Sequence, residues 1–411
     1  MNTDTNHPAN FASQATLLVS RMTREEKAAF VSGATFWSTE SLPRLGLDQA
    51  ALMSDGPIGL RKQAEGSDHL GLSGSLPATC FPAGVNIGNT WDRALAHELA
   101  GALAEECLVN DVAVILGPAM NMKRSPLCGR NFEYFSEDPH LAGVLATAYV
   151  KGAQEKGVGT SVKHFAANNQ EFGRMRIDTR VDERTLRELY LPAFQRAITE
   201  AQPWTVMSAY NQINGAFCSE NEWLLQKVLR EEWGFQGAVV SDWGAVKNRV
   251  TGVACGLDLE MPTSGTVNDR RLLAALRSGT LDEAKLDQCV VRVVSLLLAA
   301  AHTRQSKVSV LHATRLSGVG ALGRTGAAVC VENLHRNVCA SSPVDGRPCV
   351  VVRASSPVRR RPCIVASASS PVRHTSCEQA VQCELSACFL AGAPHAACVA
   401  ASFGASACRR S

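Results

Sequence analysis

Five short polar clusters hold the residue types in this chain that could do chemistry, and each follows directly after an apolar run. They lie at residues 54–57 (Ser-Asp-Gly-Pro), 117–121 (Gly-Pro-Ala-Met-Asn), 163–165 (Lys-His-Phe), 208–211 (Ser-Ala-Tyr-Asn) and 241–244 (Ser-Asp-Trp-Gly). A single aspartate after a strand is most often a turn or helix-capping residue. Five clusters in the same relative position are harder to explain as turns. We therefore expect one pocket to contain Asp55, Lys163, His164, Tyr210 and Asp242.

This set of side chains suits the binding and cleavage of a sugar. Carboxylates and cations make charge-assisted hydrogen bonds with hydroxyl groups, while tyrosine and tryptophan rings offer flat apolar faces. Up to residue 304 the chain has no His-x-His or His-Glu-x-x-His metal pattern, no Gly-x-Ser-x-Gly nucleophile turn and no Gly-x-Gly-x-x-Gly loop after a strand. We therefore expect no metal and no organic cofactor, and glycoside hydrolysis through a carboxylate nucleophile fits the residues best.

These clusters need a scaffold that brings distant positions together. Up to residue 304, short apolar or β-branched runs alternate with longer amphipathic stretches, which is typical of parallel strands joined by helices. The predicted strands lie at residues 51–54, 112–116, 159–163, 205–209, 238–241 and 257–261, and the predicted helices at 91–108, 140–154, 182–200, 220–232, 270–277 and 281–303. This alternation over about 300 residues predicts an α/β fold, a (β/α)8 TIM-barrel-like domain whose strands all end at one mouth.

The composition of the chain changes near residue 305. Residues 1–304 hold 29 basic, 34 acidic and 21 aromatic residues, whereas residues 305–411 hold 12 basic, 4 acidic and 2 aromatic residues. Nine of the 15 cysteines lie in the second piece, where Ala-Ser-Ser-Pro recurs every 14 residues. So few aromatic side chains are insufficient for an ordinary core. We predict a catalytic-type domain at 1–304 and a disordered, low-complexity tail rich in Cys, Ser, Pro and Arg at 305–411.

The origin and partners of this tail have two interpretations. Arginine outnumbers lysine 11 to 1 there, as when a GC-rich gene is read in the wrong frame, so we favour a frame-shifted or unselected extension. The alternative is a basic tail that recruits a polyanion, which predicts salt-sensitive binding.

The whole chain carries a formal net charge of only +3 and contains no apolar run of membrane-spanning length. We expect neither a nucleic-acid nor a membrane partner. The first 20 residues lack the basic and then apolar pattern of a secretory signal, from which we expect a cytoplasmic location.

Five sequence blocks resemble the N-terminal domain of family 3 glycoside hydrolases, in particular the β-glucosidases of bacterial type. They begin at Asp55, Gly129, Lys163, Met207 and Val240 and read DGPIGLR, GRNFEYFSEDP, KHFAANNQE, MSAYNQING and VSDWG. The resemblance spans roughly residues 15–304. It implies a retaining β-glycosidase that removes terminal β-D-glucosyl or related residues from the non-reducing end of a β-glucoside or oligosaccharide.

The resemblance also implies a role for each matched residue. Asp242 would be the nucleophile that forms the glycosyl-enzyme, Trp243 would be part of the sugar-binding wall, and Asp55 would hold two hydroxyls of the sugar. The residues implied to bind other hydroxyls or to lie beside the nucleophile are Arg130, Lys163, His164 and Tyr210, with Met207, Arg61 and Arg174 as weaker candidates at the rim. Glu133 and Glu137 are expected to be loop or capping residues.

The resemblance ends where a second carboxyl group would be needed. Retaining hydrolysis uses one carboxyl as nucleophile and another as general acid and base, and in the β-glucosidase branch the second comes from a sandwich-like domain after the barrel. Residues 305–411 do not resemble that domain, so we expect an enzyme truncated or frame-shifted after about residue 304 and impaired in activity. The alternatives are a non-catalytic carbohydrate-binding barrel and the β-N-acetylhexosaminidase branch. That branch has Pro-Gly-His-Gly after Lys-His-Phe, where this chain has Ala-Ala-Asn-Asn at residues 166–169.

Overall fold

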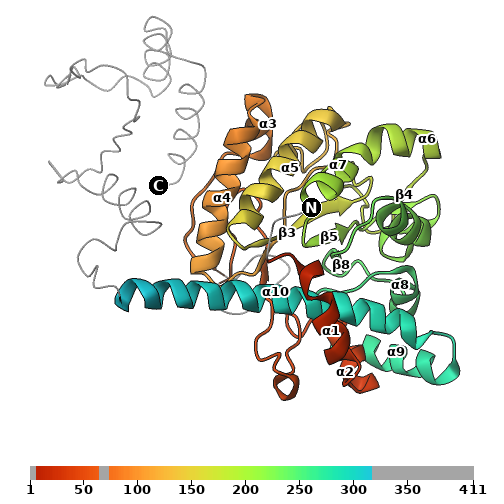
Figure 1. Ribbon diagram of the computed structural model, residues 1–411. Coiled ribbons are helices and arrows are strands. Elements are labelled where there is room, and N and C mark those ends of the chain that lie inside the picture. The colour runs from red at the N-terminus through yellow and green to blue at the C-terminus, as the bar shows by residue number, and fades with distance from the viewer. Residues whose placement is uncertain (1–5, 64–73, 317–411) are drawn as a thin grey trace, which may run out of the picture. The chain divides into compact units, whose positions relative to one another are not determined.

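A five-stranded parallel sheet is the centre of the fold (Figure 1). The computed structural model describes residues 6–63 and 74–316. In the order in which they pair, the strands are β1 (Met53–Ser54), β2 (Val114–Ile115), β3 (Gly159–Phe165), β5 (Thr205–Ser208) and β8 (Ala238–Ser241). Because all five run parallel, their carboxyl ends lie at the same edge of the sheet.

Segments of less regular backbone lie beside both outer strands of this sheet. Next to β8, the predicted strand at residues 257–261 forms single bridges instead of a regular strand, from Leu259 to Val240 and from Glu260 to Ser32. Next to β1, the Met53 amide donates to the carbonyl of Trp37 at 2.8 Å. The segment around residues 32–38 therefore contacts both ends of the sheet. The predicted α/β, TIM-barrel-like fold is confirmed, with five regular parallel strands in the part of the chain described here.

Helices follow the strands and cover the sheet. Those along the barrel wall are α3 (Gly84–Thr90), α4 (Arg93–Val109), α5 (Pro139–Glu155), α7 (Pro192–Ala201), η5 (Trp223–Glu232) and α8 (Arg249–Cys255). The others are η1 (Pro8–Phe11), α1 (Ala12–Val19), α2 (Arg24–Phe30), η2 (Pro43–Leu45), α6 (Glu183–Thr185), η3 (Leu186–Tyr190), η4 (Cys218–Glu220), α9 (Val267–Ser278) and α10 (Glu283–Leu316). A small separate sheet joins β4 (Asp178–Thr179), β6 (Gln212–Ile213) and β7 (Ala216–Phe217).

Two of the predicted helices differ from the structure in extent. The stretch predicted at 182–200 is divided into α6, η3 and α7, and α7 begins at Pro192, which has no N–H to continue the preceding turn. The helix predicted at 281–303 continues to Leu316, past the domain boundary that we predicted at 304. The rest of the predicted tail, residues 317–411, lies outside the described residues.

The strands are buried on both faces, as expected for a parallel sheet that is covered on both sides. Val162, Val206 and Val239 belong to one apolar cluster with residues of α4, α5 and α7, which lie side by side in Figure 1. Their neighbours Met207 and Val240 belong to a second cluster with α10. This alternation follows from the two-residue period of a strand.

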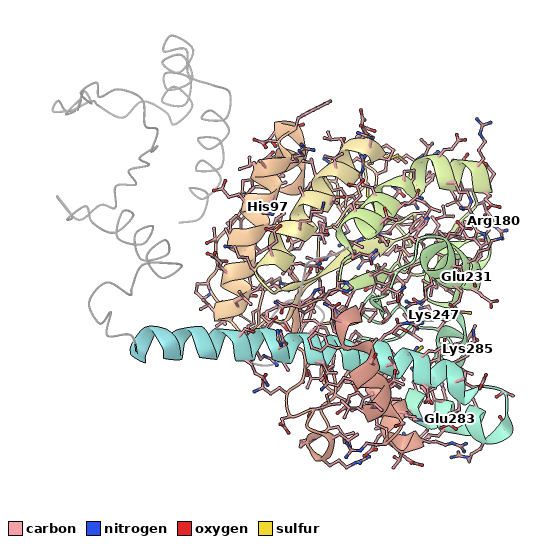
Figure 2. All side chains as sticks on the ribbon, in the orientation of Figure 1. His97, Arg180, Glu231, Lys247, Glu283 and Lys285 are labelled. Atoms are coloured by element: carbon pink, nitrogen blue, oxygen red, sulfur yellow. The ribbon has the colours of Figure 1, made fainter. Side chains whose placement is uncertain are left out.

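Ion pairs attach α10 to the N-terminal helices. Glu283 lies at the start of α10 (Figure 2) and accepts hydrogen bonds from Arg24 and Lys27 of α2 at 2.8 and 3.2 Å. None of the described helices contains a segment both long and apolar enough to cross a membrane.

Candidate active site

A cavity of about 450 Å³ lies at the carboxyl ends of the sheet strands. Its wall is formed by Phe36, Trp37, Asp55, Arg61, Leu116, Arg130, Glu133, Lys163, His164, Arg174, Met207, Tyr210, Asp242 and Trp243. All seven residues predicted as site residues are in this set, together with the three weaker candidates for the rim. The cavity therefore joins positions that are far apart in the sequence.

The strands position most of these side chains directly. Asp55 follows β1, Asp242 follows β8, and Tyr210 comes two residues after β5. Lys163 and His164 lie inside β3, which continues to Phe165, two residues beyond its predicted end. Parallel neighbours at one sheet edge place these groups around a shared space, as the spacing of the polar clusters predicted.

Asp242 has one carboxylate oxygen held by the protein and one that is not. The backbone N–H of Trp243 donates to its Oδ1 at 2.7 Å. Its Oδ2 is buried, has no hydrogen-bond partner among the described residues, and lies 3.8 Å from Nε2 of His164. Burial raises the pKa of Asp242 above its ordinary value, although the charges of Arg130 and Lys163 act in the opposite direction. Asp242 thus presents an unpaired oxygen on the cavity wall.

A network of four charged side chains fills the opposite part of the wall. Lys163 Nζ donates to Oδ1 of Asp55 at 2.8 Å and lies 3.9 Å from Oε1 of Glu133. Arg130 donates two hydrogen bonds to Glu133, both 2.8 Å long, in a bidentate pair. Burial raises the pKa of Asp55, but Lys163 outweighs it and holds that pKa below its usual value. Asp55 is therefore ionised and ready to accept hydrogen bonds from hydroxyl groups.

His164 is a neutral imidazole fixed by its neighbours. Burial, and next the charges of Arg130 and Lys163, hold its pKa well below the usual value. Its backbone N–H donates to Oδ1 of Asn121 at 2.7 Å, and the Asn121 amide donates back to the His164 carbonyl at 2.8 Å. This pair of bonds fixes the backbone of the residue whose ring faces Asp242.

Aromatic side chains form a third part of the wall. The Tyr210 hydroxyl donates to the carbonyl of Trp243 at 2.7 Å, and the Trp243 indole N–H donates to the carbonyl of Phe36 at 2.8 Å. The rings of Trp37 and Trp243 lie 5.2 Å apart between centroids. Burial and the nearby Asp242 raise the pKa of Tyr210, so its hydroxyl stays protonated. These flat faces suit the apolar face of a sugar ring.

Four lining residues were not predicted as site residues, and one of them, Leu116, is the last residue of the predicted strand at 112–116. Phe36 and Trp37 lie in the segment before β1, where the sequence has no polar cluster at the end of an apolar run. Glu133 was expected to be a loop or capping residue, yet it pairs with Arg130 three positions earlier in the same sequence block. Its position three residues after Arg130 was the sequence feature that could have indicated this pairing. In the described part of the chain, no group of three or more His, Cys, Asp or Glu side chains has the arrangement of a metal site.

Comparison with known proteins identifies the family. The model of the "Glycosyl hydrolase family 3 N terminal domain" matches residues 27–296. The chain is 51% identical over 288 residues to thermostable beta-glucosidase B of Acetivibrio thermocellus, covering 70% of this chain and 38% of that protein. It is 48% identical over 280 residues to an exo-alpha-(1->6)-L-arabinopyranosidase of Bifidobacterium longum. That match covers 68% of this chain and 37% of the relative.

Solved β-glucosidase structures are also similar to this chain. Beta-glucosidase 3B of Thermotoga neapolitana in complex with alpha-D-glucose matches with a TM-score of 0.67 and 42% identity, over 71% of this chain and 43% of that one. The chain belongs to glycosyl hydrolase family 3 and carries the N-terminal domain of that family. It spans well under half the length of these relatives.

The pKa of Asp242 leads to a prediction about stability. Because that pKa is raised in the folded chain, the folded state binds the proton more tightly than the unfolded state does. The contribution of Asp242 to the free energy of unfolding is therefore favourable below the ordinary aspartate pKa of about 4, and is lost as the pH rises through the raised pKa. Asp242→Asn should have a higher Tm than the wild type at neutral pH. The difference in Tm should shrink near pH ~4. Thermal unfolding of both proteins at the two pH values checks this prediction. An equal difference at both would show that Asp242 is not desolvated.

Proposed function

We propose that this cavity binds the terminal β-glycosyl residue of a β-glucoside or oligosaccharide and that Asp242 attacks its anomeric carbon in a retaining double displacement. The observation that carries the proposal is the unpaired, buried Oδ2 of Asp242. A carboxylate oxygen with no protein partner is free to form a bond with substrate, while Oδ1 is held by the Trp243 N–H. In this step the bond from carbon to Oδ2 forms and the aglycone oxygen leaves with the electron pair.

The charged network supports binding of the same sugar. Asp55, ionised beside Lys163, accepts hydrogen bonds from two hydroxyls, while Lys163 and Arg130 donate to others. The two tryptophans contact the ring on its apolar face. The relatives named as β-glucosidases and the neighbour solved with glucose support a glucosyl residue as the substrate class.

The departing aglycone distinguishes good substrates from poor ones. A poor leaving group needs a proton from a general acid, a contribution of about 10² to 10⁴-fold. Besides Asp242, the described carboxylates on the cavity wall are Asp55 and Glu133, and each is engaged by a cation within 2.8 Å. Lys163 holds the pKa of Asp55 below its usual value, so Asp55 is a weak proton donor at neutral pH. We propose that the chain forms the glycosyl-enzyme readily only from substrates whose leaving group needs no proton. The cytoplasmic location stays a prediction.

Asp55 gives a direct test of sugar binding. Asp55→Asn keeps the shape of the side chain but replaces charge-assisted hydrogen bonds, which are worth about 1.5–3 kcal/mol, by weaker neutral ones. We expect the Kd for glucose, measured by isothermal titration calorimetry, to rise by roughly 5- to 13-fold for each hydrogen bond that Asp55 accepts, because only the difference between charged and neutral bonds, about 1–1.5 kcal/mol, is lost. The matched control is Asp48→Asn, an exposed aspartate that does not line the cavity. Equal affinity in both variants would place the sugar elsewhere.

A further inference from the structure

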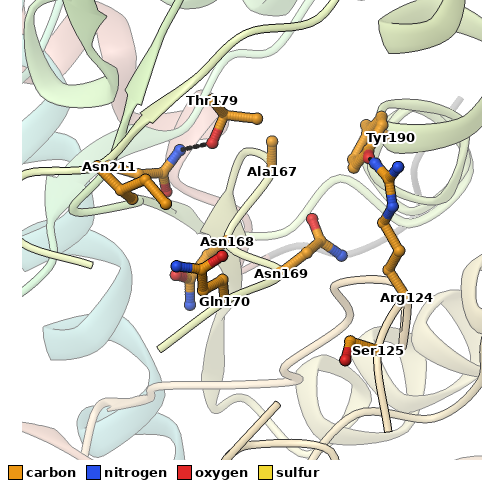
Figure 3. Close-up of a pocket in the computed structure, with 10 residues that line it drawn as sticks. Arg124, Ser125, Ala167, Asn168, Asn169, Gln170, Thr179, Tyr190 and Asn211 are labelled. Carbon is orange, nitrogen blue, oxygen red and sulfur yellow. Dashed lines mark hydrogen bonds between the residues drawn. The ribbon is translucent and has the colours of Figure 1, made fainter. Parts of the chain in front are cut away.

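A second cavity, of about 330 Å³, lies beside the segment that follows β3 (Figure 3). It shares no lining residue with the active-site cavity. Three consecutive polar residues after β3 and residues from four other segments form its wall; those used below are Arg124, Asn168, Asn169, Thr179, Tyr190 and Asn211. We call it the asparagine cavity. Its volume is at the lower end of the range of small-molecule sites, about 300–1,000 Å³.

Three asparagine side chains on this wall have amide oxygens with no hydrogen-bond partner among the described residues. They are the Oδ1 atoms of Asn168, Asn169 and Asn211, and all three are buried. The Asn168 and Asn211 residues are only 2% and 1% exposed. A buried polar oxygen without a donor is unfavourable, so three on side chains that line one cavity indicate that the cavity is built to receive donors.

The partners of the amide nitrogens fix which way each side chain points. Nδ2 of Asn211 donates to the carbonyls of Ala166 and Gln212 at 3.2 and 3.1 Å, and contacts the Thr179 hydroxyl (Figure 3). Nδ2 of Asn169 donates to the carbonyl of Met122. Rotating either amide would bring its oxygen against a carbonyl oxygen. The oxygens are therefore the groups left without partners.

Nδ2 of Asn168 is fixed in the same way. It donates to Oε1 of Glu171 at 3.1 Å and to the hydroxyl of Tyr134 at 3.2 Å. A carboxylate oxygen accepts only, so the amide nitrogen must face it. All three oxygens, on side chains that line the same cavity, are consequently left without a partner among the described residues.

The charges on the wall exclude two classes of ligand. Three amide oxygens disfavour an anion. The one formally charged lining side chain is Arg124, which contacts the Tyr190 hydroxyl and ring and disfavours a cation. Divalent cations prefer carboxylates, and no carboxylate is among the lining residues. A neutral molecule that both donates and accepts hydrogen bonds remains.

We propose that the asparagine cavity is a second binding site for a neutral, hydroxyl-rich small molecule, an aldose or polyol of monosaccharide size. Its hydroxyls donate to the three amide oxygens and accept from Arg124. The ring of Tyr190, almost fully buried, offers an apolar face. This site does not depend on hydrolysis by Asp242, so the proposal stands apart from the proposed function.

A chain of contacts joins the asparagine cavity to the active site. Asn168 donates to the Tyr134 hydroxyl at 3.2 Å, and that hydroxyl lies 3.4 Å from Nδ1 of His164. The other ring nitrogen of His164 faces Asp242 at 3.8 Å. A ligand that holds Asn168 therefore restrains the group that orients the His164 ring.

The test uses the full chain, D-glucose as the probe and isothermal titration calorimetry. The Asp55→Asn variant weakens the active-site cavity and should retain a binding event. Adding Asn169→Leu, which removes one acceptor at a half-buried position, should weaken that remaining event by at least tenfold. Asn86→Leu, the same change at an exposed position of α3, should leave it unchanged. Thermal unfolding of each variant shows whether it is folded.

Each contrary outcome points to a specific alternative. If Asp55→Asn abolishes all glucose binding, the asparagine cavity holds only water and the proposal is wrong. If the remaining event depends on sodium rather than on glucose, the amide oxygens bind a cation and the proposal is also wrong. If Asn169→Leu unfolds the chain, Thr179→Val, which removes a hydroxyl without changing the shape, serves in its place and must weaken binding. Asp242→Asn separates the two proposals, because it should stop hydrolysis and leave glucose binding at the asparagine cavity intact.

Discussion

Asp242→Ala is expected to reduce the rate of dinitrophenolate release from 2,4-dinitrophenyl β-glucoside by about 10⁴-fold or more, since removing the nucleophile of a covalent hydrolase can cost about 10⁶-fold in kcat. The physical reason is that each of the other two carboxylates on the described cavity wall is paired with a cation. Asp55 is held by Lys163, and Glu133 by Arg130. Release of the phenolate is followed by absorbance under single-turnover conditions.

Azide provides the control for this loss. In Asp242→Ala the removed carboxylate leaves room for a small anion beside the anomeric carbon. Azide should attack there once, forming a carbon–nitrogen bond as dinitrophenolate leaves with the electron pair. The product should be the α-glucosyl azide, inverted relative to the substrate, and its rate should rise with azide concentration. An Asp242→Ala protein that is folded and releases phenolate at the wild-type rate would show that another group is the nucleophile.

The second large effect is a dependence on the leaving group. Wild-type chain should release dinitrophenolate from its glucoside in a burst of one equivalent and should not turn over an alkyl β-glucoside. Dinitrophenolate departs without a proton, whereas an alkoxide needs one, and general acid assistance is worth about 10² to 10⁴-fold. The group that acts as general acid also acts as base in the second step, so without such a group the glycosyl-enzyme should accumulate.

The two glucosides must be compared with the same protein sample. Glucose binding to that sample, measured by calorimetry, shows that the cavity is intact. Steady turnover of both substrates would mean that a carboxyl in this chain does supply the proton. No reaction with either, together with normal glucose binding, would favour the carbohydrate-binding barrel over the enzyme.

The sequence predicted the positions that depend on strand ends. Asp55 and Asp242 could be placed together because each directly follows a buried apolar run, and parallel strands bring such positions to one edge. Lys163 and His164 were placed correctly in the cavity, but the strand that carries them runs to Phe165. Strand ends are set by pairing with β5, which the local sequence does not contain.

Other features depended on contacts between distant segments. Trp37 reaches the cavity because its segment bonds to Met53 of β1 and its ring packs near Trp243. Nothing in residues 34–39 alone indicates that position. The same holds for Asn168 and Asn211, which lie in sequence blocks that we singled out but were not predicted as site residues; only the fold brings them to one cavity wall.

The helices show the same division between local and distant causes. Pro192 marks the start of α7, and a proline at that position is readable from sequence because it cannot continue the preceding helix. The length of α10 was underestimated, since the helix was predicted to end at residue 303 and it continues to Leu316, past the composition change near residue 305. Composition indicates which residues are available for a core. It does not set where a helix ends, because a helix extends as long as its backbone hydrogen bonds are formed.

The central claim is that Asp242 forms a covalent bond to the sugar. The most direct measurement incubates the wild-type chain with 2,4-dinitrophenyl β-glucoside, quenches with acid and determines the intact mass and the labelled peptide. We predict one added glycosyl unit per chain, on the peptide that contains Asp242, and no added unit in Asp242→Asn. A glycosyl unit on Glu133 or Asp55, or phenolate release with no added mass at any time, would contradict the account.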